Sequence, residues 1–212
     1  MPATVSFRKS IRWIPDQASE PSDTVVLTGG KTGVFLDVRF LKDSNEIEWA
    51  FAGYRSTVLV GSEELTKFTH LIDSRTKDPL QVVDYGSNTV LSDGTILEKG
   101  EMMNPETERL TAYEEVWQDE SSDSNQAIFL QNVKYTSWYA RVGHWQLALG
   151  RDSAGVFWAF QAHSIDGDWM VVHNLGVTNS GTVTLLPEDT SHWAEGRVLE
   201  WNGDRWLVLE KE

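Results

Sequence analysis

Cysteine is absent from all 212 residues of the chain. Its absence excludes a disulfide framework, a thiolate nucleophile and any cysteine-ligated zinc or iron–sulfur site. The histidines are also few and far apart in sequence, and none has another histidine at metal-ligand spacing: His70, His144, His163, His173 and His192. The sequence therefore predicts no metal site and no cofactor.

Basic residues are scarce too, with 18 Lys and Arg against 32 Asp and Glu and a formal net charge of -14. Such a charge repels nucleic acid and anionic membrane surfaces. The segment Met1–Arg12 has no apolar run of signal-peptide length, and no stretch of the chain approaches the roughly 18 apolar residues of a transmembrane helix. We expect a cytoplasmic protein, with the nucleus as a second location, that neither binds nucleic acid nor inserts into a membrane.

Standard catalytic motifs are missing as well. The chain has no G-x-x-x-x-G-K phosphate loop, no G-x-G-x-x-G, no H-E-x-x-H and no G-x-S-x-G elbow. Hydrolase and nucleotide-binding functions lose support accordingly.

Tryptophan, by contrast, is abundant, with 10 residues. Two explanations are open. Large rings fill the interiors of small barrels, since strands favour aromatic residues. Alternatively, indoles line a cavity and stack on a flat or hydrophobic ligand.

Short apolar and aromatic runs separated by turn residues predict an all-β fold. The second half is the more regular, and Asn202-Gly203-Asp204 there predicts a type I′ turn because Asn and Gly tolerate positive φ. Helical periodicity is nowhere sustained, and the two short helices that we expect are Glu63–Lys67 and Pro187–Trp193.

An acidic, Ser-rich stretch without apolar residues, Gln118–Gln126, divides the chain. Such composition is typical of a linker. We therefore expect an N-terminal barrel over residues 1–117, a linker over 118–126 and a C-terminal barrel over 127–212.

The period of two along a strand predicts which side chains share a face. The expected inward sets are Val5, Phe7, Ile11 and Trp13, and Ile47, Trp49 and Phe51. The strand Val156–His163 is apolar on both faces and needs cover on both. We expect it where the two barrels meet, or where two chains meet in a homodimer.

Four segments stand out along the chain: EWAFAG at Glu48–Gly53, EVWQ at Glu115–Gln118, VGHW at Val142–Trp145 and GDRW at Gly203–Trp206. Together they resemble segments of the fungal HRI family, which is named for a casein-kinase-interacting yeast protein. The resemblance implies two tandem antiparallel lipocalin-like β-barrels. For the yeast member it also implies association with a casein kinase I homologue, a protein kinase, and with a translocon subunit, and it implies no catalytic chemistry.

Candidate ligand-binding residues follow from the barrel hypothesis. In the second barrel, a histidine on a predicted strand can project into the lumen as a proton donor or acceptor, although a structural role is the alternative for each. The candidates for proton transfer are His144, His163 and Tyr139. The candidates for binding are Trp158, Trp169, His173 and Arg141, together with Tyr54 and Tyr113 in the first barrel.

Two functions remain open from the sequence. The first is cofactor-independent binding of a hydrophobic small molecule in a Trp-lined cavity. Its catalytic form is a pericyclase-like lyase, isomerase or cyclase of fungal natural-product biosynthesis, which holds a reactive substrate in a near-attack pose for dehydration, isomerisation or cycloaddition. The second is a non-catalytic interaction protein that binds a kinase or a translocon subunit.

Overall fold

The computed structural model describes residues 1–121, 126–176 and 183–212. Its first part is a closed antiparallel barrel in which each strand pairs with the next and β8 pairs with β1. The strands are β1 (Thr4–Trp13), β2 (Ser22–Thr28), β3 (Val34–Leu41), β4 (Ile47–Val60), β5 (Glu63–Asp73), β6 (Tyr85–Val90), β7 (Ile96–Asn104) and β8 (Arg109–Ser121). A short 3-10 turn, Pro79–Gln81, precedes β6.

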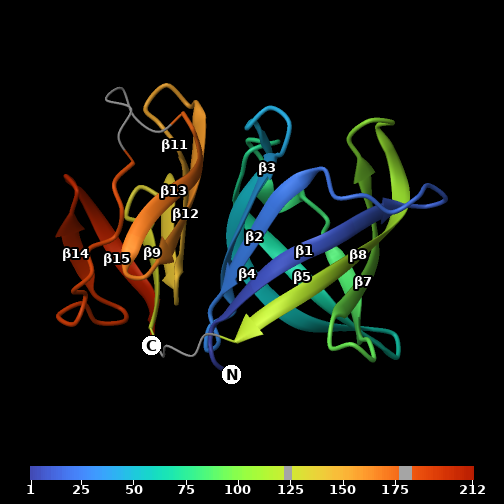
Figure 1. The fold of residues 1–212 in the computed structure, drawn as a ribbon, viewed down its shortest axis with the longest axis horizontal. Coiled ribbons are helices and arrows are strands. Elements are labelled where there is room, and N and C mark those ends of the chain that lie inside the picture. Colours follow the sequence, from blue (N-terminus) through green and yellow to red (C-terminus); the bar gives the residue numbers. More distant parts are fainter. Residues whose placement is uncertain (122–125, 177–182) are drawn as a thin grey trace.

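The second part is a seven-stranded antiparallel sheet in the order β13-β12-β11-β10-β9-β15-β14. Its strands are β9 (Ala127–Asn132), β10 (Ser137–Val142), β11 (Trp145–Arg151), β12 (Phe157–Ile165), β13 (Asp168–Leu175), β14 (Val198–Trp201) and β15 (Asp204–Lys211). The sheet lies beside the barrel, facing β2, β3 and β4 (Figure 1). The all-β prediction is confirmed, and a barrel followed by a second antiparallel sheet agrees with two tandem units.

The strands β2, β3 and β4 form a wall of the barrel whose outer face is apolar. Alternate side chains of β3, from Val34 to Phe40, point outward and are fully buried. They pack against the inward face of the second sheet, where Phe129, Trp138 and Leu149 are also fully buried. The barrel and the sheet therefore share one apolar core, which we call the interface layer.

Polar contacts fix the sheet on the wall. The side-chain amide of Gln161 in β12 donates to the backbone oxygens of Asp23 (2.9 Å) and Val38 (2.7 Å). The guanidinium of Arg151 in β11 donates to the backbone oxygens of Asp73 (2.6 Å) and Thr76 (2.9 Å). These donors satisfy carbonyl groups that the contact would otherwise bury unpaired.

Strand β15, the last strand in chain order, is hydrogen-bonded to the turn between β2 and β3. The Glu210 carboxylate accepts hydrogen bonds from the backbone nitrogens of Lys31 (3.1 Å) and Thr32 (2.8 Å). A Cβ at Gly29 would lie 2.6 Å from this carboxylate, so the approach requires glycine there. The C-terminal strand thus helps to shape the barrel.

Strand β12 is covered on both faces, as its sequence predicted. Ala159 belongs to the interface layer, whereas Phe160 and Ala162 belong to a second apolar cluster on the far side of the sheet. Since both covers come from this chain, its pattern does not require a second copy.

Two inward sets are wrong because a β-bulge splits each of them. Pairing between β3 and β4 skips a residue between Ile47 and Trp49, so Trp49 packs inside the barrel while Ile47 packs against the interface layer. A shift at Lys9 in β1 likewise leaves Val5 on the interface layer and brings Trp13 against Tyr113. One extra residue exchanges the two faces of a strand.

The local predictions have mixed outcomes. Asn202 and Gly203 have φ of 50 and 75, as a type I′ turn requires. The two expected short helices are wrong, because Glu63–Lys67 belongs to β5 and residues 187–193 form no helix. Within the expected linker, β8 continues through Ser121, which pairs with Thr4, and residues 122–125 lie outside the described residues. The division of the chain at 118–126 stays a prediction.

The shared interface layer makes the stability of the two parts interdependent. We expect Leu149→Ala to lower the free energy of unfolding by about 2–5 kcal/mol, because it leaves a cavity in a fully buried layer. The control Leu59→Ala, at an exposed site of the barrel, should change it little. Urea unfolding followed by tryptophan fluorescence and circular dichroism should give one transition, and two separate transitions in the wild type would contradict a shared core.

Candidate functional site

The barrel encloses a cavity of about 360 Å³. Its rim is exposed and includes Arg55, Thr57, Glu64 and Asn88. Its floor is buried and carries both rings and charges: Phe35, Asp37, Arg39, Phe51, Glu98 and Glu115. The first barrel is therefore partly hollow and reachable from solvent.

Aromatic and aliphatic side chains form one part of the cavity wall. Phe35 makes edge-on contacts with Phe51 (centroids 5.7 Å apart) and Phe68 (5.4 Å). Met102 packs against the same group, and Trp117 of β8 also lines the cavity. Rings held by one another in this way offer a rigid apolar surface.

Buried ion pairs form the opposite part. The Glu115 carboxylate accepts hydrogen bonds from Arg8 (2.6 Å) and Arg39 (3.2 Å) through the same oxygen. Arg39 also makes a two-pronged contact with Asp37 (3.0 and 2.7 Å), and Arg8 a similar one with Glu20 (2.9 and 3.1 Å). Burial alone would lower the pKa of the Arg39 guanidinium, but Asp37 and Glu115 raise it well above the ordinary value. Both guanidinium groups are therefore charged and held by carboxylates.

Glu98 is the carboxyl group of the floor that lacks such a partner. It is 7% exposed and accepts one hydrogen bond, from the Tyr113 hydroxyl at 2.8 Å. Burial, followed by the charges of Glu115 and Asp84, raises the pKa of Glu98 to about 8. Burial and the Glu98 charge also raise the pKa of Tyr113, so its hydroxyl stays a donor.

A second polar chain runs from Trp49 to Asp84. The Trp49 indole donates to Asp73 (3.1 Å), and the His70 ring bridges Asp73 (2.8 Å) and Asp84 (3.1 Å). The imidazole also stacks on Phe51. Burial by itself lowers the pKa of His70, but hydrogen bonds to Asp73 and Asp84 outweigh it and raise the pKa. The chain fixes Asp84 at the edge of the cavity.

The two tyrosines expected in the first barrel lie on different faces. Tyr113 points into the barrel and holds Glu98. Tyr54 packs on the interface layer, with its ring edge-on to Trp138 at 6.4 Å. Tyr113 therefore contacts a residue that lines the cavity, Glu98, without lining the cavity itself, and Tyr54 lies outside the cavity.

The three residues expected to transfer protons do not form one site in the structure. His144 is exposed in the turn between β10 and β11. His163 is half-buried against Trp145 at 4.4 Å, and burial lowers its pKa. Tyr139 is buried in the cluster on the far side of the sheet, edge-on to Trp206. A catalytic role for this set stays a prediction.

The other expected binding residues are also dispersed. His173 bridges Asn45 (2.5 Å) and Asp23 (3.1 Å) at the contact between sheet and barrel. Trp158 and Trp169 pack, half-buried, on the far-side cluster. Arg141 is buried and donates to the backbone oxygen of Pro187 at 2.8 Å.

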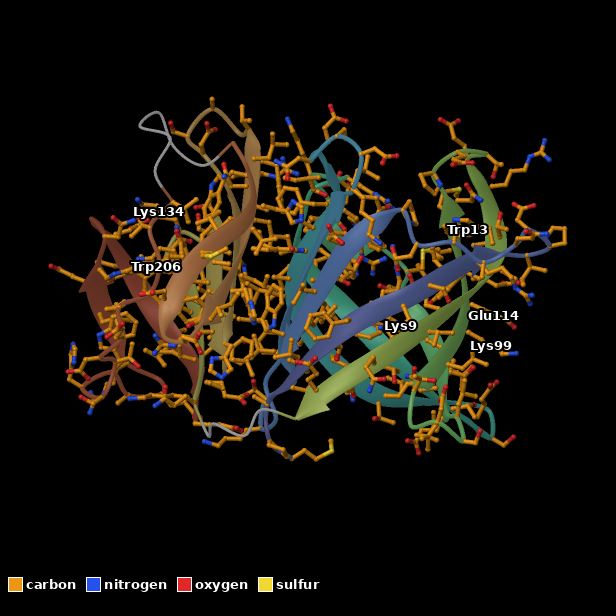
Figure 2. The ribbon with its side chains drawn as sticks, in the orientation of Figure 1. Lys9, Trp13, Lys99, Glu114, Lys134 and Trp206 are labelled. Carbon is orange, nitrogen blue, oxygen red and sulfur yellow. The ribbon has the colours of Figure 1, made fainter. Side chains whose placement is uncertain are left out.

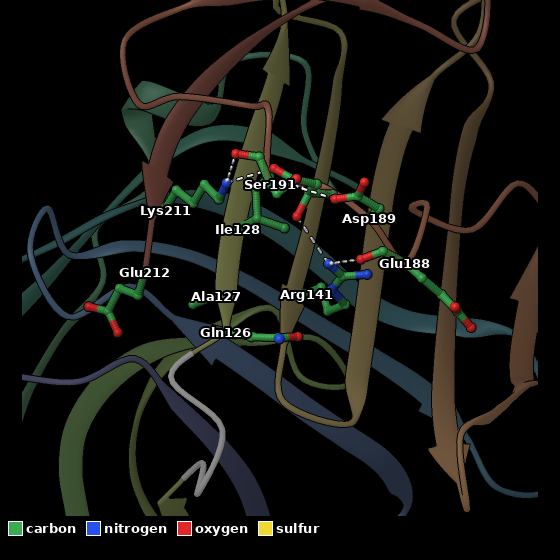
Figure 3. Close-up of a pocket in the computed structure, with 10 residues that line it drawn as sticks. Gln126, Ala127, Ile128, Arg141, Glu188, Asp189, Ser191, Lys211 and Glu212 are labelled. Carbon is green, nitrogen blue, oxygen red and sulfur yellow. Dashed lines mark hydrogen bonds between the residues drawn. The ribbon is translucent and has the colours of Figure 1, made fainter.

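A second, smaller cavity of about 240 Å³ lies beside Arg141 (Figure 3). Lys211 also lines it, and its ammonium donates to the backbone oxygens of Thr190 (2.6 Å) and Trp193 (2.8 Å). Both cations are thus engaged with the segment before β14. We regard this cavity as the place where that segment is fastened to the sheet.

The charged residues of the larger cavity were missed by sequence reasoning. Their signal is nevertheless visible, since β3 reads VFLDVRFL, with Asp37 and Arg39 at alternate positions of an otherwise apolar run. Two charges on one face of a buried strand require partners on facing strands. Glu115, one of those partners, is adjacent to Glu114, and the side chains of adjacent strand residues point to opposite faces of the sheet.

The fold and the cavity define the class of protein: an antiparallel β-barrel with a charged, partly hollow interior, backed by a second antiparallel sheet. A comparison with protein families narrows the class. The model of the family described as Protein HRI1 matches residues 4–210, nearly the whole chain, and the chain belongs to this family. The resemblance noted in the sequence is thereby confirmed. No curated protein and no solved structure matches the chain.

A membrane-spanning helix and a metal-binding cluster are both absent from the described residues. None of their helical segments has the length and hydropathy needed to cross a membrane. In the same ranges, no group of three or more His, Asp or Glu side chains is arranged to hold a metal ion.

Glu115 can be tested against its neighbour in sequence. Glu115→Gln should lower the free energy of unfolding by about 3–5 kcal/mol, since two buried guanidiniums lose their common counter-charge. The control Glu114→Gln removes a half-buried carboxylate on the outer face of β8, where it pairs with Arg12 at 2.8 Å and with Lys99 at 2.9 Å (Figure 2). Its effect on the free energy of unfolding, measured in urea, should be much smaller, about 1 kcal/mol or less, because ion pairs at the surface contribute little. Equal effects of the two variants would refute the buried network.

Proposed function

We propose that this protein binds a small amphipathic molecule, with an apolar body and a polar end, inside the β1–β8 barrel. The observation that carries the proposal is the cavity of about 360 Å³ in that barrel, which runs from an exposed rim to a buried floor. Its volume falls within the roughly 300–1,000 Å³ of ligand sites, and such sites combine apolar walls with a few placed polar groups. Binding of this kind requires neither a metal nor a redox cofactor.

The proposal refines the hydrophobic ligand and the Trp-lined cavity expected from the sequence. Trp117 supplies an indole to the lining, but Phe35, Phe51 and Phe68 supply most of the rings. The polar part, with Glu98 and Arg39, makes an amphipathic ligand a better match than a purely hydrophobic one.

A catalytic form of the proposal is dehydration, isomerisation or cycloaddition of the bound molecule, with fungal biosynthesis as its setting. Glu98 favours this form over a passive carrier, because a carboxyl with a pKa of about 8 is mostly protonated at neutral pH and can give up a proton.

The binding proposal is tested with a neutral fluorescent probe, N-phenyl-1-naphthylamine. The full-length protein should give a saturable fluorescence increase with one probe per chain, confirmed by native mass spectrometry. Val26→Trp places a large ring at an inward site of the cavity and should weaken binding at least tenfold. Val198→Trp, at an exposed site of β14, is the matched control and should bind as the wild type does. Equal binding by both variants would place the probe elsewhere.

An interaction protein is the second candidate, because an apolar edge strand favours it. Among the described strands, β13 ends the sheet and pairs with β12 alone. Exposed apolar side chains lie on it or just before it: Ile165, Met170, Val171, Val172 and Leu175. An unpaired edge is a place where another chain can add a strand, either a kinase, a translocon subunit or a second copy in a homodimer.

This second candidate makes a separate prediction. Met170→Lys should weaken binding of purified casein kinase I homologue or translocon subunit at least tenfold, since it places a charge on the apolar edge. Leu110→Lys, at an exposed site on the barrel, is the control and should bind normally. Biolayer interferometry measures both, and no binding by the wild type would reject the candidate.

A further inference from the structure

Charge in the barrel cavity is unevenly distributed. Six carboxyl groups line it, against two guanidinium groups: Asp37, Glu64, Asp84, Glu98, Glu115 and Asp119 against Arg39 and Arg55. All three side-chain nitrogens of Arg39 donate hydrogen bonds to Asp37 or Glu115. Arg8 lies behind Glu115 and is likewise bound by carboxylates. An ionised Glu98 would therefore add a negative charge that neither of these guanidinium groups is left to pair.

Glu98 is the carboxyl group of the cavity floor that has no cationic partner in the part of the chain that the structure describes. Its side chain is more than nine-tenths buried, lines the cavity, and uses one oxygen to accept the Tyr113 hydroxyl. Among the described residues, no Lys, Arg or His nitrogen forms an ion pair with it. A buried carboxyl usually has a cationic or hydrogen-bonding partner for each oxygen. Here the open side is the cavity itself.

The surroundings of Glu98 suit a positive charge rather than a negative one. Besides burial, four neighbouring groups shift the pKa of Glu98: Glu115 and Tyr113 of β8, Asp84 before β6 and Arg39 of β3. Two of these four groups are carboxylates. Phe35, Phe51 and Trp117 also line the cavity and give it an apolar surface, and the Arg39 guanidinium already lies over the rings of Phe51 (5.5 Å) and Trp117 (5.8 Å). A protonated amine attached to an apolar body would satisfy both parts.

We infer that the ligand of the barrel is an aryl or alkyl amine, bound as its ammonium ion with Glu98 as the counter-ion. The inference rests on the function proposed above and names its ligand class. Tyr113 positions the Glu98 carboxylate, the ammonium donates to the free oxygen, and the apolar body lies on the rings.

Binding should release a proton. In the empty site Glu98 is mostly protonated at pH 7, because its pKa is raised to about 8. The ammonium ion keeps its protons, so Glu98 must lose its own to become the counter-ion, and that proton goes to solvent. Above about pH 8 Glu98 is already ionised and the release should vanish.

The test uses three ligands with one ring system: 1-naphthylmethylamine, 1-naphthylmethanol and 1-naphthoate. Isothermal titration of the full-length protein at pH 7, in phosphate and in Tris, gives both affinity and proton release. We expect the amine to bind at least tenfold more tightly than the alcohol, and the carboxylate to bind most weakly. The amine should release close to one proton per site at pH 7, whereas at pH 9, where the free amine is itself partly deprotonated, binding should take up a fraction of a proton instead.

Two variants separate the role of Glu98 from the integrity of the cavity. Glu98→Gln should lose at least tenfold in amine affinity and all proton release, while its affinity for the alcohol stays within twofold. Glu114→Gln, on the outer surface, should behave as the wild type with all three ligands.

The outcomes distinguish the inference from the function on which it rests. Equal affinities for amine and alcohol would overturn the amine inference and leave the cavity as a neutral binding site. Tightest binding of the carboxylate would overturn it in favour of recognition by Arg39 or Arg55. Failure of all three ligands, and of the neutral probe, would reject ligand binding in this barrel altogether.

Discussion

The structure depends on one unusual arrangement: the β2–β4 wall of the barrel has a fully apolar face outside and a face that mixes rings with charges inside. Because successive side chains alternate, the choice for one face decides the other. The outer face, with Val34, Leu36 and Val38 fully buried, must be covered, and the second sheet covers it. The inner face then brings Asp37 and Arg39 into the barrel, where they must be paired. Covering sheet and charged interior are thus two results of a single pattern.

The same arrangement brings ion pairs as well as rings into the barrel. One oxygen of Glu115 accepts hydrogen bonds from Arg8 and Arg39, and the cavity of about 360 Å³ is lined by Glu115 and Arg39. The tryptophans mostly serve the packed regions, where Trp138 and Trp206 are buried in the two clusters of the sheet. The first explanation of the tryptophan excess, filling of packed interiors, therefore holds for the buried tryptophans of the sheet, whereas stacking on a ligand stays a prediction, with Trp117 as the tryptophan that lines the barrel cavity.

Local sequence signals predicted the class of fold and several details well. Alternation and turn residues indicated an all-β chain, the two-faced β12 and the turn at Asn202-Gly203. Two features of the fold could not be predicted from these local signals: the positions of the β-bulges and the place of strand β6. A bulge at Lys9 or beside Ile47 has no composition signal, yet it exchanges the faces of all later residues in the strand. Strand β6 is polar and mostly exposed, so its place follows from closure of the barrel rather than from its residues. The charged site could not be predicted for a related reason. The sequence shows that a face of a strand is apolar, but it does not show whether that face points into the barrel or toward a neighbouring sheet.

The position of the covering sheet at the end of the chain has a consequence for biosynthesis. A ribosome releases the β2–β4 wall well before β9–β12, so the nascent barrel presents an apolar surface to solvent until the later strands emerge. The hydrogen bonds of Glu210 to the turn after β2 form later still, once β15 has been made. Synthesis of this protein therefore includes an interval in which a large apolar surface of the barrel is uncovered.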